Sequence, residues 1–343
     1  MKNPSVQKLR LLYIVDILSR KSDEEHPLSA TDIMDYLRKD YEIECERKTV
    51  YDCIENLNNY GYEIIKSQSP RGYFMTPYYF EPAELRLMID AVQSADFISA
   101  KKTKALIKKF SAFASEYQYK RIEKQVYIDN RNKCANENLF IVIDIISSAI
   151  LSKKQIEVVY RRRKIVDGKN AKYEEKTMVI NPYALIWAED HYYLVGNYSK
   201  YDNLIHLRID RLKSVNVLDT YARHFSEVSP YQTYFDIADY SNKHLSMFSG
   251  DIKPVEMICN NSMIEDFIDQ FGEKVNMRHF DDDNFIAKVD VAVTDGLVAW
   301  IMQYGDKIKV RSPKELKNMI IDKTKSILEL YNVWNDKILT YII

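Results

Sequence analysis

The sequence predicts an α+β protein made of several domains, and three observations lead to that class. The chain has 343 residues, and one hydrophobic core rarely serves more than roughly 250–300 residues. Apolar residues recur at helical spacing before residue 60 and between residues 81 and 151, whereas residues 155–219 alternate as short strands. From residue 253 to about residue 331, strand-like and helix-like segments alternate again. We therefore expect helical, strand-rich and mixed parts in succession.

Three helices are expected within the first 61 residues. The first covers about residues 6–19, and the second begins at Ser29 or Ala30, where Ser29 and Asp32 have the spacing of a helix cap. The third covers residues 46–60 and ends at Gly61, a residue type that commonly terminates helices. The inner faces of the last two helices are predicted to carry Ile33, Met34 and Leu37, and Val50, Cys53, Ile54 and Leu57.

Two strands joined by a tight loop are expected after the third helix. Residues 62–66 and 73–75 have strand character, and the polar residues 67–72 between them are typical of a turn. Three helices followed by a hairpin are the pattern of a winged helix-turn-helix. We assign this domain to residues 1–80.

The amino-terminal turn of the third helix carries the residues that could meet DNA. In a winged helix this turn enters the major groove, while other groups hold phosphates. Arg47 and Lys48 could instead form a solvated helix face, but an Arg at the tip of the following hairpin favours DNA binding. The expected DNA-binding residues are Arg47, Lys48, Thr49, Tyr51 and Arg71.

Charge is unevenly distributed, although the formal net charge is only −1. Residues 1–80 carry 11 basic and 13 acidic side chains, residues 81–135 carry 11 and 7, residues 153–219 carry 13 and 9, and residues 251–335 carry 11 and 15. Any DNA contact therefore depends on local clusters rather than on a strongly basic domain.

The rest of the chain is expected to form four further segments. Residues 81–152 are predicted to be a helical connector with helices at 81–99, 101–115 and 137–151, the first two of which could form a dimerising arm. Residues 153–220 indicate a small barrel or sandwich, residues 221–250 an irregular linker rich in aromatic residues, and residues 251–343 a small α+β module.

Motifs in two parts of the chain resemble the WYL family of transcriptional regulators. The stretch ERKTVYDCIENL (46–57) with PRGY (70–73) resembles their DNA-binding end, although Asp52 and Cys53 stand where members often have Arg and Asp. In the strand-rich part, YYL (192–194) stands where the family has Trp-Tyr-Leu, NPY (181–183) resembles its Pro motif, and LRIDRL (207–212) matches its signature. The resemblance implies a homodimeric bacterial regulator with an Sm-like five-stranded barrel, the WYL domain, that senses a ligand, often a nucleotide or nucleic-acid fragment.

The strand pattern also predicts a polar face on this barrel. In LIHLRIDR (204–211), His206, Arg208 and Asp210 alternate with apolar residues. Guanidinium groups bind phosphate bidentately and tyrosines stack on bases. Alternatively, Arg208 and Arg211 pair with Asp210 and Glu157; the two interpretations are balanced for Arg211, and ligand binding is favoured for Arg208 with His206. The candidate ligand-binding residues are Tyr160, Arg162, Tyr183, Tyr193, His206, Arg208 and Arg211.

Catalytic and metal-binding classes lack their motifs in this sequence. The eight glycines form neither a phosphate-binding loop nor a nucleophile elbow, and no HExxH is present. Cys45, Cys53, Cys134 and Cys259 are scattered, without a CxxC pair. His191 and His206 have no metal partner at useful spacing, and the acidic residues 281–284 are more simply a turn. We expect no enzyme activity, cofactor or metal.

Composition predicts a cytoplasmic protein. Hydrophobic content of 46% and charged content of 29% are typical of a soluble globular chain. No apolar run reaches the roughly 18 residues of a membrane helix, and the start MKNPSVQKLR is not a secretory signal. The expected partners are a double-stranded DNA operator, a nucleotide or nucleic-acid-fragment ligand and a second copy of the chain, with no membrane. The alternative is an accessory protein that binds RNA or single-stranded DNA without operator-specific regulation.

Overall fold

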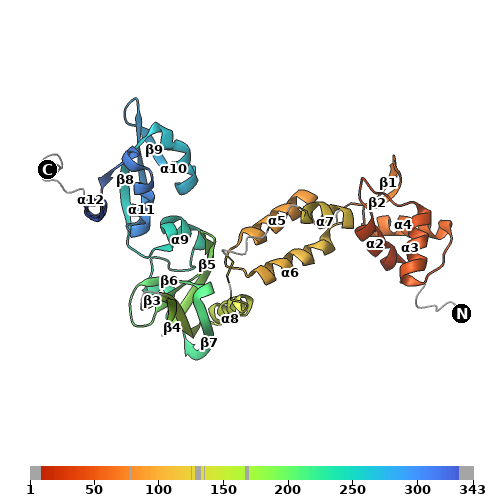
Figure 1. Ribbon diagram of the computed structural model, residues 1–343, viewed down its shortest axis with the longest axis horizontal. Helices are drawn as coiled ribbons and strands as arrows, with labels where there is room; N and C mark the ends of the chain where they lie inside the picture. Colours follow the sequence, from red (N-terminus) through yellow and green to blue (C-terminus); the bar gives the residue numbers. More distant parts are fainter. Residues whose placement is uncertain are drawn as a thin grey trace. The chain divides into compact units, whose positions relative to one another are not determined.

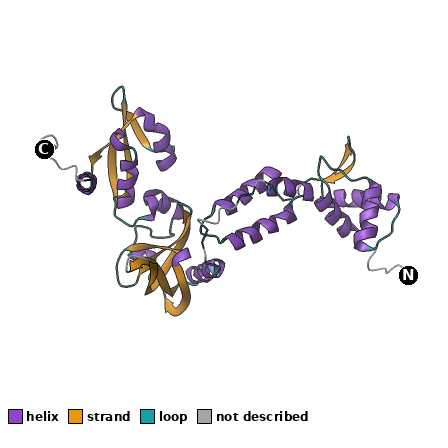
Figure 2. Cartoon of the chain, in the orientation of Figure 1, coloured by secondary structure: helices purple, strands orange, loops and turns teal. Residues whose placement is uncertain are grey.

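The computed structural model describes residues 9–76, 79–124, 126–127, 133–134, 136–166 and 170–331, and it divides into two compact units. Unit 1 spans Met1–Glu137 and unit 2 spans Asn138–Ile343 (Figure 1). In the described residues, unit 1 is helical apart from one β-hairpin, whereas unit 2 contains two antiparallel sheets with helices (Figure 2). The mixed α+β class predicted from the sequence is therefore present.

Unit 1 begins with the predicted order of three helices and a hairpin. Ser29 and Asp32 form a complete capping box at the second helix, and Gly61 ends the third in the left-handed region with φ +119°. The buried stripes of the second and third helices pack together with the first helix in one core, which contains Ile14, Ile17, Ile33, Leu37, Val50, Ile54 and Leu57. The elements are α2 (Arg10–Lys21), α3 (Ala30–Tyr41), α4 (Arg47–Tyr60), β1 (Ile64–Gln68) and β2 (Arg71–Met75).

Two boundaries at this end differ from the prediction. The expected start of the first helix falls on residues 6–8, which lie outside the described residues. The hairpin strands are longer than expected, because Ser67, Gln68, Arg71 and Gly72 also pair across the ladder. Polar side chains on a solvent-exposed ribbon do not prevent backbone pairing, so the turn shortens to residues 69–70.

The hairpin is held against the start of α3 by backbone contact. The amide of Leu28 donates to the Tyr73 carbonyl at 2.8 Å, and the amide of Tyr73 donates to the Leu28 carbonyl at 2.7 Å. A Cβ at Gly72 would lie 2.9 Å from the Leu28 carbonyl carbon, so only glycine permits this approach. This contact fixes the hairpin relative to the helices.

Three helices complete unit 1: α5 (Pro82–Ser94), α6 (Ala100–Phe110), which continues as η1 (Ser111–Phe113), and α7 (Glu116–Glu123). The first two are shorter than predicted because Ser99 and Ser115 each cap a new helix. The sequence analysis missed α7. Asp23, in the loop after α2, accepts a hydrogen bond from the Ser115 hydroxyl at 2.6 Å, and thereby ties α7 to the amino-terminal helices.

The first sheet of unit 2 has five antiparallel strands in the order β6-β5-β4-β3-β7. Helix α8 (Leu139–Leu151) packs on β3, β4 and β7, so this third helix of the predicted connector belongs with the sheet. The short helix η2 (Ile209–Arg211) ends the alternation predicted for residues 204–211 at Arg208. The strands are β3 (Lys154–Val166), β4 (Asn170–Ala188), β5 (His191–Tyr198), β6 (Leu204–Arg208) and β7 (Leu212–Tyr221).

Residues 222–251 are more ordered than the predicted irregular linker. They contain η3 (Phe225–Glu227), α9 (Ile237–Lys243) and η4 (Leu245–Met247). Their aromatic side chains form an apolar cluster with the sheet, in which Phe235 and Tyr240 pack near Tyr183, Ile186 and Val195. Burial of these rings against β4 and β5 supplies the order that local propensity does not.

The carboxy-terminal module of unit 2 is built on a four-stranded antiparallel sheet in the order β11-β8-β10-β9. Residues 281–283 form the expected turn before β10, while β9 and β11 were not predicted. Among the described residues, no helix has the length and apolar character needed to cross a membrane. The elements are β8 (Ile252–Asn260), η5 (Asn261–Met263), α10 (Ile264–Phe271), β9 (Asn276–His279), β10 (Asn284–Ala292), α11 (Asp295–Gln303), η6 (Gly305–Lys307), β11 (Ile308–Ser312) and α12 (Lys314–Leu330).

Candidate functional site

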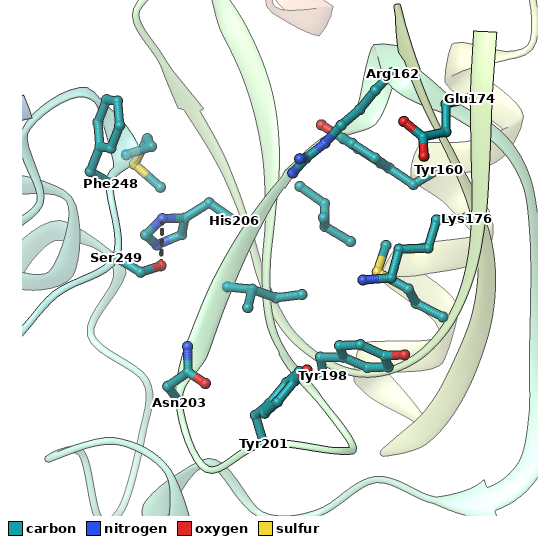
Figure 3. Close-up of a pocket in the computed structure, with 14 residues that line it drawn as sticks. Tyr160, Arg162, Glu174, Lys176, Tyr198, Tyr201, Asn203, His206, Phe248 and Ser249 are labelled. Carbon is teal, nitrogen blue, oxygen red and sulfur yellow. Dashed lines mark hydrogen bonds between the residues drawn. The ribbon is translucent and has the colours of Figure 1, made fainter. Parts of the chain in front are cut away.

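A pocket of about 740 Å³ opens on the five-stranded sheet of unit 2 (Figure 3). Strand register explains its composition, because Tyr160 lies opposite Lys176 and Arg162 lies opposite Glu174 on one face of the β3–β4 ribbon. Ile205 and Leu207 of β6, with Met178 and Met247, supply the apolar part of the lining. The pocket therefore combines charged, aromatic and apolar surfaces.

Two cations of this pocket are not neutralised within the chain. In the described residues, no ion pair involves Arg162 or Lys176, and each instead lies over a tyrosine ring: Arg162 at 5.8 Å from Tyr160 and Lys176 at 5.2 Å from Tyr198. On the opposite face of the same strands, Arg161 pairs with Glu175 at 2.9 Å. The ribbon thus turns a paired face one way and a cationic face toward the pocket, which suits an anionic ligand.

Aromatic rings and an amide stand beside these cations. Tyr198 and Tyr201 meet edge to face with centroids 5.5 Å apart, and Phe248 lies on the far side of the pocket and is half exposed (Figure 3). Asn203 lies between Tyr201 and His206 on the lining. Such rings can stack on planar ligand groups while the cations hold phosphate.

His206 lines the pocket, but both of its ring nitrogens are engaged. Nε2 lies 2.6 Å from the Tyr240 hydroxyl and Nδ1 lies 3.2 Å from the Ser249 hydroxyl. Burial, with a smaller contribution from nearby His244, lowers the pKa of His206 to about 4. The ring is therefore neutral at pH 7, and it joins the sheet to α9 and residue 249 rather than offering a positive charge.

The structure brings together some of the predicted ligand residues and separates others. Tyr160, Arg162 and His206 line the pocket, whereas Tyr183, Tyr193, Arg208 and Arg211 lie outside its lining. The Tyr183 hydroxyl donates to the Arg223 carbonyl at 3.0 Å, and burial raises the pKa of Tyr183 far above its usual value.

Arg208 follows the structural alternative that the sequence left open. It makes two hydrogen bonds to Asp210, at 3.1 and 2.7 Å, and both side chains are largely buried. Tyr193 lies directly across the ladder from Arg208, and burial raises the pKa of its hydroxyl. Arg211 is exposed at the end of η2. These residues form a polar group on the sheet outside the pocket lining.

The sequence analysis missed several lining residues. Lys176 could have been found from its strand register with Tyr160, but that register depends on a hairpin whose turn the sequence does not specify. Tyr198, Tyr201 and Asn203 surround the β5–β6 turn. Phe248 and Ser249 come from the segment predicted to be a linker, so no local signal placed them at the sheet.

A candidate nucleic-acid interface lies in unit 1. Arg47, Lys48 and Tyr51 are exposed on α4, and Thr49 is partly buried. Arg47 donates a hydrogen bond to the Thr31 hydroxyl at 2.8 Å, and the Tyr51 ring lies 6.1 Å from that of Tyr73 on β2. Arg71 is exposed at the start of β2. Helix and hairpin therefore present one continuous polar surface through the Tyr51–Tyr73 contact.

The fold and pocket define a multidomain α+β protein with a ligand-sized cavity on a small antiparallel sheet. Family models match two segments, a WYL domain at residues 142–217 and a WCX domain at residues 262–328. The chain is thus a WYL-domain protein with a carboxy-terminal WCX domain, as the motifs at residues 181–183, 192–194 and 207–212 predicted.

Solved structures give only distant similarities. Proteasome accessory factor B/C (PafBC) of Arthrobacter aurescens is 16% identical with a TM-score of 0.27, covering 92% of this chain and 46% of that one. A CRISPR Cas-related protein is 13% identical with a TM-score of 0.25, covering 96% of this chain and 92% of that one. This chain therefore spans less than half the length of the PafBC chain. No curated protein sequence matches it.

Proposed function

We propose that this protein is a DNA-binding transcription regulator that responds to an anionic, nucleotide-like ligand. The observation that carries the proposal is the face of the β3–β4 ribbon on which Arg162 and Lys176 are left without carboxylate partners beside stacked tyrosines. Cations of this kind bind phosphate, and the rings match the planar part of a nucleotide. The WYL and WCX domains support the regulatory class.

The proposal includes the finer folds expected from the sequence. We interpret α2 to α4 with β1 and β2 as a winged helix-turn-helix, supported by the backbone pairing of Leu28 with Tyr73. We interpret the sheet β7-β3-β4-β5-β6 as an Sm-like barrel, supported by the short helix η2 between its two edge strands. The protein acts in the cytoplasm, is not an enzyme, and binds a palindromic operator as a homodimer.

DNA binding is tested by removing the three exposed cations of the helix and hairpin. The Arg47→Ala/Lys48→Ala/Arg71→Ala variant is expected to bind duplex DNA more weakly and to flatten the log–log salt dependence by about one unit per lost phosphate contact. Lys314→Ala/Lys323→Ala/Lys325→Ala in α12 is the control, since it removes the same charge from exposed positions in the carboxy-terminal module. Equal binding by wild type and the first variant in mobility shifts at two salt concentrations would exclude this surface.

Ligand binding is tested first on the purified protein. We expect bound nucleotide material, detected by absorbance ratio and mass spectrometry, in wild type and much less in Arg162→Ala/Lys176→Ala. Each charge-assisted hydrogen bond contributes about 1.5–3 kcal/mol, so each substitution should cost roughly tenfold or more in affinity. Arg161→Ala is the matched control, because Arg161 lies on the same strand but pairs with Glu175 on the opposite face.

The alternative function is an accessory protein that binds RNA or single-stranded DNA without regulating an operator. The two functions differ in coupling, since a regulator's ligand must change its affinity for duplex DNA. Ligand binding that leaves duplex affinity unchanged would favour the accessory protein.

A further inference from the structure

One wall of the pocket is a seven-residue segment, residues 244–250, that we call the strap. Met247, Phe248 and Ser249 of the strap line the pocket opposite Arg162 and Tyr160 (Figure 3). Residues 245–247 form η4, which also packs against α11 of the carboxy-terminal module. The strap thus has the pocket on one side and α11 on the other.

Polar side chains bind the strap to the five-stranded sheet. The Ser249 hydroxyl lies 3.2 Å from Nδ1 of His206, and the other nitrogen of that ring meets Tyr240 just before the strap. The Ser246 hydroxyl donates to the Glu189 carboxylate at 2.8 Å. A displacement of residues 246–249 would therefore be felt directly by β6 and by the β4–β5 turn.

Close backbone packing joins the strap to the first turn of α11. A Cβ built on Gly296 would lie 2.6 Å from the Leu245 carbonyl oxygen and 2.9 Å from the Phe248 ring. At the end of the strap, a Cβ on Gly250 would lie 2.5 Å from the side chain of Thr294, the residue that caps α11. The two elements touch so closely that movement of one requires movement of the other.

The strap backbone is strained between these two attachments. Ser246 and Met247 are consecutive non-glycine residues in the left-handed region, with φ of 52° and 53°. This conformation is unfavourable for residues with a Cβ, and it persists only where surrounding contacts impose it. Strain of this kind is concentrated at ligand clamps and switch segments.

We propose that the strap couples the pocket to the carboxy-terminal module, so that a ligand touching Phe248 or Ser249 alters the packing of the first turn of α11. The proposal rests on the proposed function only in that the pocket takes an anionic, nucleotide-like ligand. The strap is the element that both sites bias, and coupling between two sites is reciprocal. A change at Gly296 must therefore reach the pocket even in the absence of ligand.

The first experiment needs no ligand and uses the full chain. Gly296→Ala forces the strap off α11, and amide hydrogen exchange in β6 and residues 240–249 is expected to rise about fivefold or more. Ala299→Ser, an exposed position on the same helix, is the control and should leave these amides unchanged. If Gly296→Ala does not fold, Phe248→Ala provides the test from the other side, with faster exchange expected at residues 294–298. An effect confined to the mutated module, in whichever variant folds, would overturn the proposal.

The second experiment uses 5′-phosphorylated thymidine dinucleotide as the probe. Wild type is expected to show altered exchange at residues 295–298 on binding the probe, and Gly296→Ala to bind it with an affinity changed about fivefold or more. Probe binding that protects β3 and β4 but leaves α11 and the affinity of Gly296→Ala unchanged would overturn the coupling while the proposed function stands. If the probe does not bind wild type, the proposed ligand class fails, and the ligand-free Gly296→Ala experiment still decides whether the strap couples the two sites.

Discussion

Mild acid should destabilise unit 2 through the neutral, buried ring of His206. The pKa of this ring is about 4 in the folded protein, against 6.5 for an ordinary histidine, because the ring is buried and lies near His244. Since the folded pKa is the lower one, the unfolded chain binds the proton first as the pH falls. The stabilisation is complete above pH 6.5 and is lost progressively between pH 6.5 and pH 4.

The size of the effect follows from the two pKa values. One pKa unit corresponds to about 1.36 kcal/mol, so the loss from His206 is about 2 kcal/mol at pH 5 and about 3 kcal/mol near pH 4. Burial also lowers the pKa of His244, which adds to the loss in the same direction. A contribution of 2 kcal/mol is a large part of the stability of a typical domain.

The assay is urea unfolding at pH 7.5, 6.0 and 5.0, followed by amide hydrogen exchange in β5 and β6. His206→Gln should show a smaller loss between pH 7.5 and 5.0 than wild type, by about 2 kcal/mol. His224→Gln, at an exposed histidine, is the control and should behave as wild type. An unchanged pH dependence in His206→Gln, or a pKa near 6.5 for His206 by NMR titration, would refute the reasoning.

Three further predictions concern the hairpin, the sheet and the assembly. Gly72→Ala should cost about 1–3 kcal/mol in the urea unfolding of unit 1, because its Cβ would meet the Leu28 backbone; an unchanged midpoint would show that the hairpin can move away freely. Arg208→Ala should destabilise unit 2 by about 1–3 kcal/mol without any ligand, since Asp210 loses its two hydrogen bonds; unchanged melting with weaker probe binding would instead support the original ligand assignment of Arg208. The full chain should scatter light as a dimer at micromolar concentration, because one winged helix reads too short a site for useful specificity; a monomer with and without duplex DNA would contradict this.

Local chemistry was sufficient to predict many elements of the fold. The capping pair Ser29–Asp32 and the terminating Gly61 place α3 and the end of α4 within a residue, because these signals act through neighbouring backbone groups. The short motifs at residues 181–183, 192–194 and 207–212 were enough to indicate the WYL domain. Strand alternation put His206 and Arg208 on one face, and this held as far as β6 extends.

Partner choice among charged side chains could not be predicted in the same way. Arg161, Arg162 and Arg163 are adjacent and chemically identical, yet Arg161 pairs with Glu175 whereas Arg162 faces the pocket. That difference depends on the β3–β4 register, which joins residues 14 apart or more near the pairs concerned. Arg208 likewise became a partner of Asp210 only because η2 bends the chain back after β6.

By itself, then, the sequence determined what acts locally: helix caps, strand alternation, the motifs of the WYL domain and the positions of exposed basic residues on α4 and the hairpin. Only the tertiary structure decided that an aromatic segment after β7 folds onto the sheet, that Phe248 and Ser249 close one wall of the pocket, and that Gly296 meets the strap. The physical reason is that these contacts join residues far apart in the chain. Their free energy comes from burial and close packing, which no local pattern in the sequence records.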